Sequence, residues 1–145
     1  MNPVRVKLRQ LMREQLVKLA PEKTFSGMAL GIDQDFVSVC IDLKIPFVAA
    51  VPFLEQASQW PEESQRIYYA LLDEAVQVVY VSEPGYAVWK MQKRNEWMVD
   101  QVGEDGVVLA IWDGSSGGTG NCVKYAKRLD RQIVRINPDE VAMSL

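Results

Sequence analysis

Two kinds of hydrophobic pattern follow one another along the chain. Residues 4–19 place apolar side chains three or four positions apart, with arginine and lysine between them, which predicts an amphipathic helix ended by Pro21. The segments IPFVAAVPF (45–53) and GVVLAIW (106–112) are instead continuously apolar, which is typical of strands covered on both faces. The chain is therefore predicted to combine surface helices with buried parallel strands.

The remaining segments continue this alternation. Strands are predicted in KTFSG (23–27), VQVVYVS (76–82) and QIVRINP (132–138), and helices over 32–43, 60–75, 86–102 and 118–129. Five strands alternating with about five helices predict right-handed crossovers and a mainly parallel sheet with helices on both faces. We therefore predict an α/β fold, a single Rossmann-like domain over residues 1–145.

Composition and charge narrow the classes of function. The net charge of −3 and the isoelectric point of about 5.0 argue against a protein that coats nucleic acid. The absence of histidine excludes an imidazole base, and two cysteines are too few for a disulfide framework or a cysteine-rich zinc site. We predict neither a metal nor a cofactor. No apolar run approaches about 18 residues and no signal-peptide pattern begins the chain, so we expect a cytoplasmic protein without a membrane partner.

The stretch WDGSSGGTGNC (112–122) has four glycines among the seven residues from 114 to 120. It joins a predicted strand to a predicted helix, an arrangement that points free N–H groups at an anion. It lacks the GK[ST] sequence of a P-loop and the dinucleotide motif GxGxxG. The alternative is a flexible turn that needs glycine for positive φ. The candidate ligand-binding residues of this loop are Asp113, Gly114, Gly117, Gly118 and Thr119.

A second glycine-bearing loop, SGMALGID (26–33), also leads from a predicted strand into a helix. Its acid, in the first helical turn, could accept hydrogen bonds from a ribose diol or orient a loop amide. The alternative is an acid that only stabilises the helix dipole, by roughly 0.3–1 kcal/mol. The candidate ligand-binding residues here are Ser26, Gly27, Met28, Gly31 and Asp33.

The helix predicted over 86–101 carries aromatic and cationic residues at helical spacing. One face is predicted to hold Tyr86, Trp89, Lys90, Lys93 and Trp97, with Arg94 one step round. Aromatic rings beside cations can stack a base and hold phosphates. An interface or core face is the alternative, because Trp, Tyr and Arg are also favoured there.

These stretches together resemble a known family. SGMALGID, WPEESQ, KMQKRNEWMVD and GGTGNCV are similar to segments of the YpsA-like proteins, which belong to the Rossmann-like SLOG superfamily. That superfamily also contains the bacterial DNA-processing protein A and the Lonely Guy phosphoribohydrolases. The resemblance covers roughly residues 20–138. It implies binding of a nucleotide or nucleotide-derived ligand at the strand ends, with Arg94 and Asn95 among the binding residues.

Two departures from the resemblance change what it implies. The family's usual first strand, which ends in a Thr-Gly-His-Arg-like motif, is missing, and the chain starts at the helix that follows it. An unpaired sheet edge favours association, so we expect a homo-oligomer. Arg94 and Met98 match an Arg-x-x-x-Met pattern of the Lonely Guy enzymes, but their catalytic glutamate falls at about Val123. No catalytic residue is therefore assigned.

Three functions remain open at this point. The first is binding of a nucleotide-like phosphoribosyl small molecule at the glycine-rich loops. The second is a nucleoside 5'-monophosphate phosphoribohydrolase, which would need a relocated carboxylate such as Glu55 or Asp113. The third is single-stranded nucleic-acid binding through Trp89 and Trp97, which the acidic isoelectric point disfavours. Binding is better supported than hydrolysis.

Overall fold

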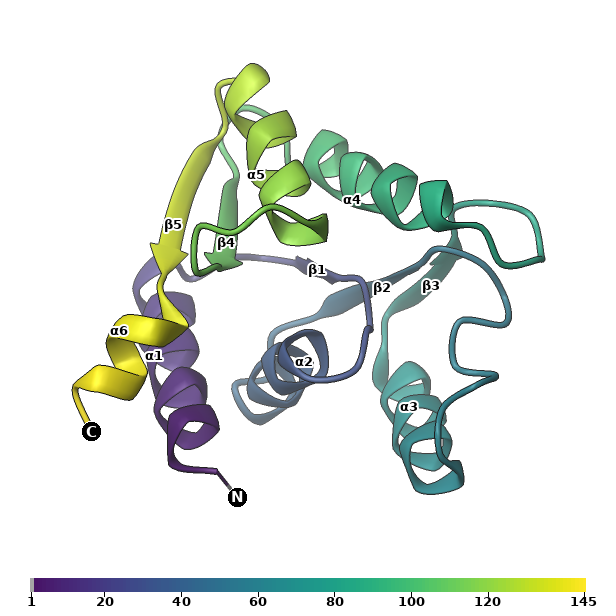
Figure 1. Ribbon diagram of the computed structural model, residues 1–145, viewed down its shortest axis with the longest axis horizontal. Helices are drawn as coiled ribbons and strands as arrows, with labels where there is room; N and C mark the ends of the chain where they lie inside the picture. The colour runs from purple at the N-terminus through teal and green to yellow at the C-terminus, as the bar shows by residue number, and fades with distance from the viewer. Residues whose placement is uncertain (1) are drawn as a thin grey trace.

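The computed structural model describes residues 2–145, which form alternating helices and strands (Figure 1). The strands are β1 (Thr24–Ser26), β2 (Phe47–Val51), β3 (Gln77–Tyr80), β4 (Val107–Ile111) and β5 (Gln132–Ile136). The helices are α1 (Pro3–Leu19), α2 (Ile32–Asp42), α3 (Glu62–Glu74), α4 (Val88–Val102), α5 (Gly118–Arg128) and α6 (Pro138–Met143). The predicted Rossmann-like α/β fold is confirmed.

Each pair of neighbouring strands runs parallel, but the strands form two separate sheets. One has the order β1-β2-β3 and the other pairs β4 with β5. Within residues 2–145 no strand precedes α1, and none bridges β1 and β4. The expected missing strand therefore coincides with a break in the sheet.

The break explains why one of the two predicted buried strands is less buried than expected. All five residues of β2 are buried, because β2 pairs with a strand on each side and is covered by helices. In β4 only Ala110 is fully buried, and the other four residues are half-buried. The prediction that GVVLAIW forms a buried strand is thus correct for the strand and wrong for its burial, since one edge of β4 has no neighbouring strand within residues 2–145.

Helices cover both faces of the strands, as predicted. Figure 1 shows α4 and α5 on one face and α1, α2, α3 and α6 on the other. The short helix α6 was not predicted from the sequence. Asn137 caps it by accepting a hydrogen bond from the Asp139 N–H, Pro138 opens it, and Val141 packs with Leu8 and Met12 of α1.

The order of the strands reverses between β1 and β4. From β1 the chain adds β2 and then β3 on one side, and α4, which contacts both β2 and β4, returns it to the other side. Figure 1 shows β4 and β5 on the opposite side of β1 from β2 and β3. Ligands of open α/β sheets bind beyond the carboxyl ends of the strands at such a reversal. The loops that follow β1 and β4 are the two glycine-bearing stretches.

Candidate functional site: two glycine loops at the strand reversal

The loop after β1 is held by its own side chains. The Ser26 hydroxyl accepts a hydrogen bond from the Met28 N–H and donates one to the Asp33 carbonyl, both at 3.2 Å. The Asp33 carboxylate accepts from the Ala29 N–H at 3.1 Å. Met28 is fully buried and has a left-handed backbone, with φ of 62°. The Met28 side chain therefore belongs to the core, and Asp33 orients a loop amide, one of its two predicted roles.

Arg94 joins this loop to α4. Its buried guanidinium donates through Nη1 to the carbonyl of Gly27 at 2.6 Å and to that of Ala50 at 3.3 Å. Its Nε donates to the Asn95 side chain at 2.9 Å. A Cβ atom on Gly27 would lie 2.6 Å from the Arg94 Cζ atom. A side chain at position 27 would therefore displace the guanidinium, which lies directly against the backbone.

Gln56, in the loop after β2, makes a second contact to the same carbonyl. Its Nε2 donates to the Gly27 oxygen at 3.2 Å. Sequence reasoning did not select Gln56, since nothing in the local pattern indicates a bond across 29 residues. The Gly27 carbonyl therefore accepts from two side chains, which fixes the direction of the chain as it leaves β1.

Titratable groups from three helices meet beside this loop: Asp33 of α2, Arg94 of α4 and Cys122 of α5. Burial raises the pKa of the Asp33 carboxyl, and the positive charge of Arg94 opposes that shift. Burial lowers the pKa of Arg94, and Asp33 opposes that shift in turn. Burial also raises the pKa of the half-buried Cys122 thiol of α5. Cys122 is therefore a protonated thiol at neutral pH and lacks the activation of a nucleophile.

The loop after β4 has a defined shape of its own. The Asp113 carboxylate accepts a hydrogen bond from the Ser115 N–H at 2.9 Å, and the Trp112 indole donates to the Ser115 carbonyl at 2.8 Å. Gly114 has φ of 93° and Gly117 has φ of 143°. The bonds from Ser115 hold the pKa of the exposed Asp113 carboxyl below its usual range. At these glycines the turn needs positive φ, as the alternative interpretation proposed.

The same loop also encloses space. A hollow of about 220 Å³ is lined by residues 111–113 and 115–120 together with Pro138. Helix α5 begins there. Like α2, α3 and α4, it has no side-chain cap on its first N–H groups, whereas Asn2 and Asn137 cap α1 and α6. A Cβ atom on Gly118 would meet nothing within 4 Å. Thr119 lies in the first turn of α5, so the loop combines a turn with an open helix N-terminus.

The predicted shared aromatic face of α4 is wrong in part. Lys90 and Arg94 are buried, and the Trp97 ring packs edge-on against Phe25 with 6.0 Å between ring centroids. Trp89 is 56% exposed, with the Lys93 ammonium 5.7 Å from its ring centre. Because α4 packs on the sheet and on α5, some of these side chains point into the core and others to the surface. They therefore do not form one stacking platform.

Lys90 instead organises the loop after β3. Its ammonium donates to the carbonyls of Glu83 at 2.9 Å and Gly85 at 2.6 Å. Glu55, from the loop after β2, accepts from the Gly85 N–H at 2.8 Å. The other carboxylate oxygen of Glu55 is buried and has no hydrogen-bond partner among residues 2–145. Both side chains thus serve loop structure at the carboxyl edge of the sheet.

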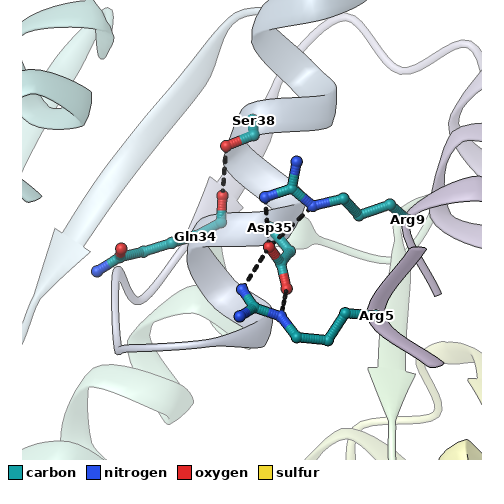
Figure 2. Close-up of polar contacts among 5 residues, drawn as sticks. All are labelled: Arg5, Arg9, Gln34, Asp35 and Ser38. Atoms are coloured by element: carbon teal, nitrogen blue, oxygen red, sulfur yellow. Dashed lines mark hydrogen bonds and ion pairs between the residues drawn. The ribbon is translucent and has the colours of Figure 1, made fainter. Parts of the chain in front are cut away.

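A cluster missed from the sequence fixes α1 against α2. Figure 2 shows the fully buried Asp35 carboxylate between the guanidinium groups of Arg5 and Arg9. Arg5 donates at 2.8 and 3.0 Å, and Arg9 at 2.6 and 2.9 Å. The pairing links residues about thirty positions apart, so periodicity alone does not reveal it. It holds the first turn of α2, and with it the loop that carries Gly31.

Comparison with known proteins places the chain in a family. The family model described as the YspA SLOG family (YpsA) matches residues 2–141. The chain belongs to this family of SLOG proteins.

The alignments with two named relatives cover most of both chains. The uncharacterised SPbeta prophage-derived protein YoqJ of Bacillus subtilis is 33% identical over 160 residues, covering 95% of this chain and 92% of YoqJ. A UPF0398 protein of Brevibacillus brevis is 24% identical over 151 residues, covering 94% of this chain and 78% of that protein. The names of these two proteins state neither a ligand nor an activity.

No three Cys, Asp or Glu side chains of residues 2–145 gather in a way that could ligate a metal ion. Over the same residues, no helix has both the length and the apolar character needed to cross a membrane.

Proposed function

We propose that this protein binds a nucleotide or a nucleotide-derived phosphoribosyl compound in the crevice beyond the carboxyl ends of β1 and β4. The observation that carries the proposal is the uncapped N-terminus of α5, which opens into a hollow of about 220 Å³ formed by the loop after β4 and Pro138. Free N–H groups at a helix start attract anions, and the reversal is where α/β folds bind ligands. Membership of the SLOG family supports a nucleotide-related ligand.

In this proposal each of the two glycine loops binds a different part of the ligand. Gly117, Gly118 and Thr119 at the start of α5 bind the phosphate, since no side chain at the glycines keeps an anion away from the backbone. The loop after β1 binds the sugar, with Asp33 as the acceptor for its hydroxyl groups. One oxygen of Asp33 already accepts from the Ala29 N–H, which leaves the second for the ligand.

Arg94 and Asn95 act together in this proposal. Arg94 donates through Nε to the Asn95 side chain and through Nη1 to the carbonyls of Gly27 and Ala50. These hydrogen bonds shape the loop. Its Nη2 makes no hydrogen bond within residues 2–145 and is the atom proposed to meet the ligand. Arg94 is thus mainly a positioning residue. From the sequence we expected it to act chiefly by contacting the ligand directly.

Binding without hydrolysis is favoured by the residue at position 123. The resemblance to the Lonely Guy enzymes assigns that position to a catalytic glutamate, and here it is a buried valine. An apolar side chain cannot protonate a leaving group in N-glycosidic cleavage. The inward packing of Trp97 on Phe25 likewise removes one ring from the proposed nucleic-acid platform.

Calorimetric titration against a panel of nucleoside monophosphates, with the matching nucleosides as controls, tests the proposal. We expect a monophosphate to bind and its nucleoside to bind at least tenfold more weakly, because only the phosphate meets the start of α5. Arg94→Ala should weaken binding by about one to two orders of magnitude, as expected for loss of a charge-assisted bond of about 1.5–3 kcal/mol. Equal affinity for nucleoside and nucleotide would contradict it.

A further inference from the structure

We propose that a groove between α4 and α5 binds a small anion that carries several phosphate groups. We call it the α4–α5 groove and define it by the five residues that line its volume of about 570 Å³: Gln92, Asn121, Lys124, Lys127 and Arg128. The two helices lie side by side in Figure 1. None of the five residues lines the hollow at the start of α5, so this site goes beyond the function proposed above.

The charge of the lining is the first observation. Three of the five residues are cations, the other two are neutral amides, and no carboxylate lines the groove. The chain as a whole has a net charge of −3, so this concentration of positive charge runs against the average of the molecule. A cleft lined by one sign of charge attracts ions of the opposite sign.

The second observation is that these cations are unpaired. Lys124, Lys127 and Arg128 are exposed, and none of them makes an ion pair within residues 2–145. By contrast, every arginine of α1 and Arg66 of α3 pair with a carboxylate. The positive charges of the α4–α5 groove therefore remain available to a ligand.

Two acids of α4 lie close to the groove, but they bond to other groups. Glu96 accepts a hydrogen bond from Gln92 Nε2 at 3.1 Å, and Asp100 accepts one from the Tyr125 hydroxyl at 2.7 Å. The ring centre of Tyr125 lies 5.4 Å from the Arg128 guanidinium. Tyr125 thus places Arg128 beside α4, and within the described residues neither acid neutralises a cation of the groove.

The spacing of the cations indicates the class of ligand. Lys124 and Arg128 lie about one helical turn apart, or about 6 Å along α5, and Lys127 comes between them in the chain. Three charges over this length match two or three linked phosphates better than a single phosphate. Arginine binds phosphate through two parallel bonds and lysine as a point charge, and the amides of Gln92 and Asn121 supply further donors.

The size and lining of the groove favour a small molecule over a nucleic acid. Its volume of about 570 Å³ lies within the range of about 300–1,000 Å³ that is usual for small-molecule sites. Proteins that bind single strands stack the bases on aromatic rings, and no aromatic side chain lines the groove. Inorganic tripolyphosphate is therefore a suitable probe, because it has the linked phosphates without a base or a sugar.

Calorimetric titration with inorganic tripolyphosphate tests the proposal. We expect wild type to bind at a single site, and Lys124→Gln/Lys127→Gln to bind at least tenfold more weakly, because two of the three charges are removed. Lys18→Gln/Lys44→Gln is the matched control, since it removes two exposed lysines outside the groove and changes the net charge equally. It should keep the wild-type affinity. All four lysines are exposed, so circular dichroism should show both double variants folded.

A titration of Gly118→Val separates this site from the start of α5. That variant should lose nucleotide binding and still bind tripolyphosphate as wild type does, whereas loss of tripolyphosphate would assign the anion to the start of α5 and overturn the proposal. Absence of binding by wild type, or equal weakening in the control variant, would also overturn it. A single-stranded oligonucleotide that displaces tripolyphosphate and binds more tightly would overturn the assignment to a small molecule.

Discussion

At the scale of single residues, the contact between Arg94 and Gly27 organises the site. A buried guanidinium is costly unless its donors are occupied, and here two backbone carbonyls and the Asn95 side chain accept from it. The carbonyls belong to the end of β1 and to β2, so the charge from α4 ties these two strands together. Asp33 balances part of that charge.

Gly27→Ala should destabilise the fold, because its Cβ atom would lie 2.6 Å from Cζ of Arg94 and displace the guanidinium from its acceptors. We expect a loss of about 1–3 kcal/mol in the free energy of unfolding, the cost of leaving buried polar groups unsatisfied. Chemical denaturation measures it. Gly118→Ala is the control and should change stability by less than about 1 kcal/mol, since its Cβ atom meets nothing within 4 Å. Equal stability of the two variants would contradict the packing argument.

The pH dependence of stability should report on Asp33. Burial raises the pKa of its carboxyl above the ordinary 3.8, so between that value and its folded pKa the native state binds more protons than the unfolded state. The contribution of Asp33 to the free energy of unfolding therefore falls as pH rises through this window. Denaturation midpoints of wild type and Asp33→Asn across pH 4 to about 7 should show the variant gaining relative stability as pH rises. A difference that is constant or of opposite sign would show that Asp33 is not penalised by burial.

At the scale of elements, the sequence predicts most strands and helices correctly because each has a clear period. The apolar run of β2 and the amphipathic pattern of α1 are local signals, and both are confirmed. The burial of β4 was not predictable in the same way, since it depends on whether a strand lies at its inner edge. The same limit applies to Arg94, whose acceptors lie 44 and 67 residues away in the chain.

For the glycine loops too, the sequence predicts one property and not another. Their position after β1 and β4 follows from the order of elements, and the sequence therefore locates the candidate site. Which glycine is constrained does not follow, because it depends on neighbours in space. A Cβ atom on Gly120 would lie 2.8 Å from the Ser115 carbonyl oxygen, whereas Gly118 faces open space. Of these two glycines, only Gly118 has open space around it.

Hydrogen exchange should distinguish β2 from β4. β2 has a paired strand on both sides and five buried residues, whereas β4 pairs, in the described part of the chain, only with β5. We expect the amides of β4 that face away from β5 to exchange at least tenfold faster than those of β2, because they lack strand partners. Mass spectrometry of peptic fragments measures the rates. Equal protection of Ala49 and Leu109 would mean that the inner edge of β4 is covered in solution.

At the scale of the whole molecule, the reversal of strand order places the two glycine loops at the carboxyl ends of β1 and β4. The loop after β1 is set by Arg94, and the loop after β4 by the bonds of Trp112 and Asp113 to Ser115. Neither loop alone offers both an open helix start and a buried pair of opposite charges. The fold combines them at the point where α/β proteins bind ligands.

Calorimetric titration of wild type and Gly118→Val with a nucleoside monophosphate tests this account most directly. The valine side chain has room in the folded protein, because nothing lies within 4 Å of a Cβ atom there, and we expect it to keep an anion away from the start of α5. We predict that wild type binds, and that Gly118→Val folds with an unchanged circular dichroism spectrum and loses binding by at least a hundredfold. Binding by a folded Gly118→Val at wild-type affinity, or no binding by wild type to any nucleotide, would contradict the central claim that the start of α5 holds a phosphate.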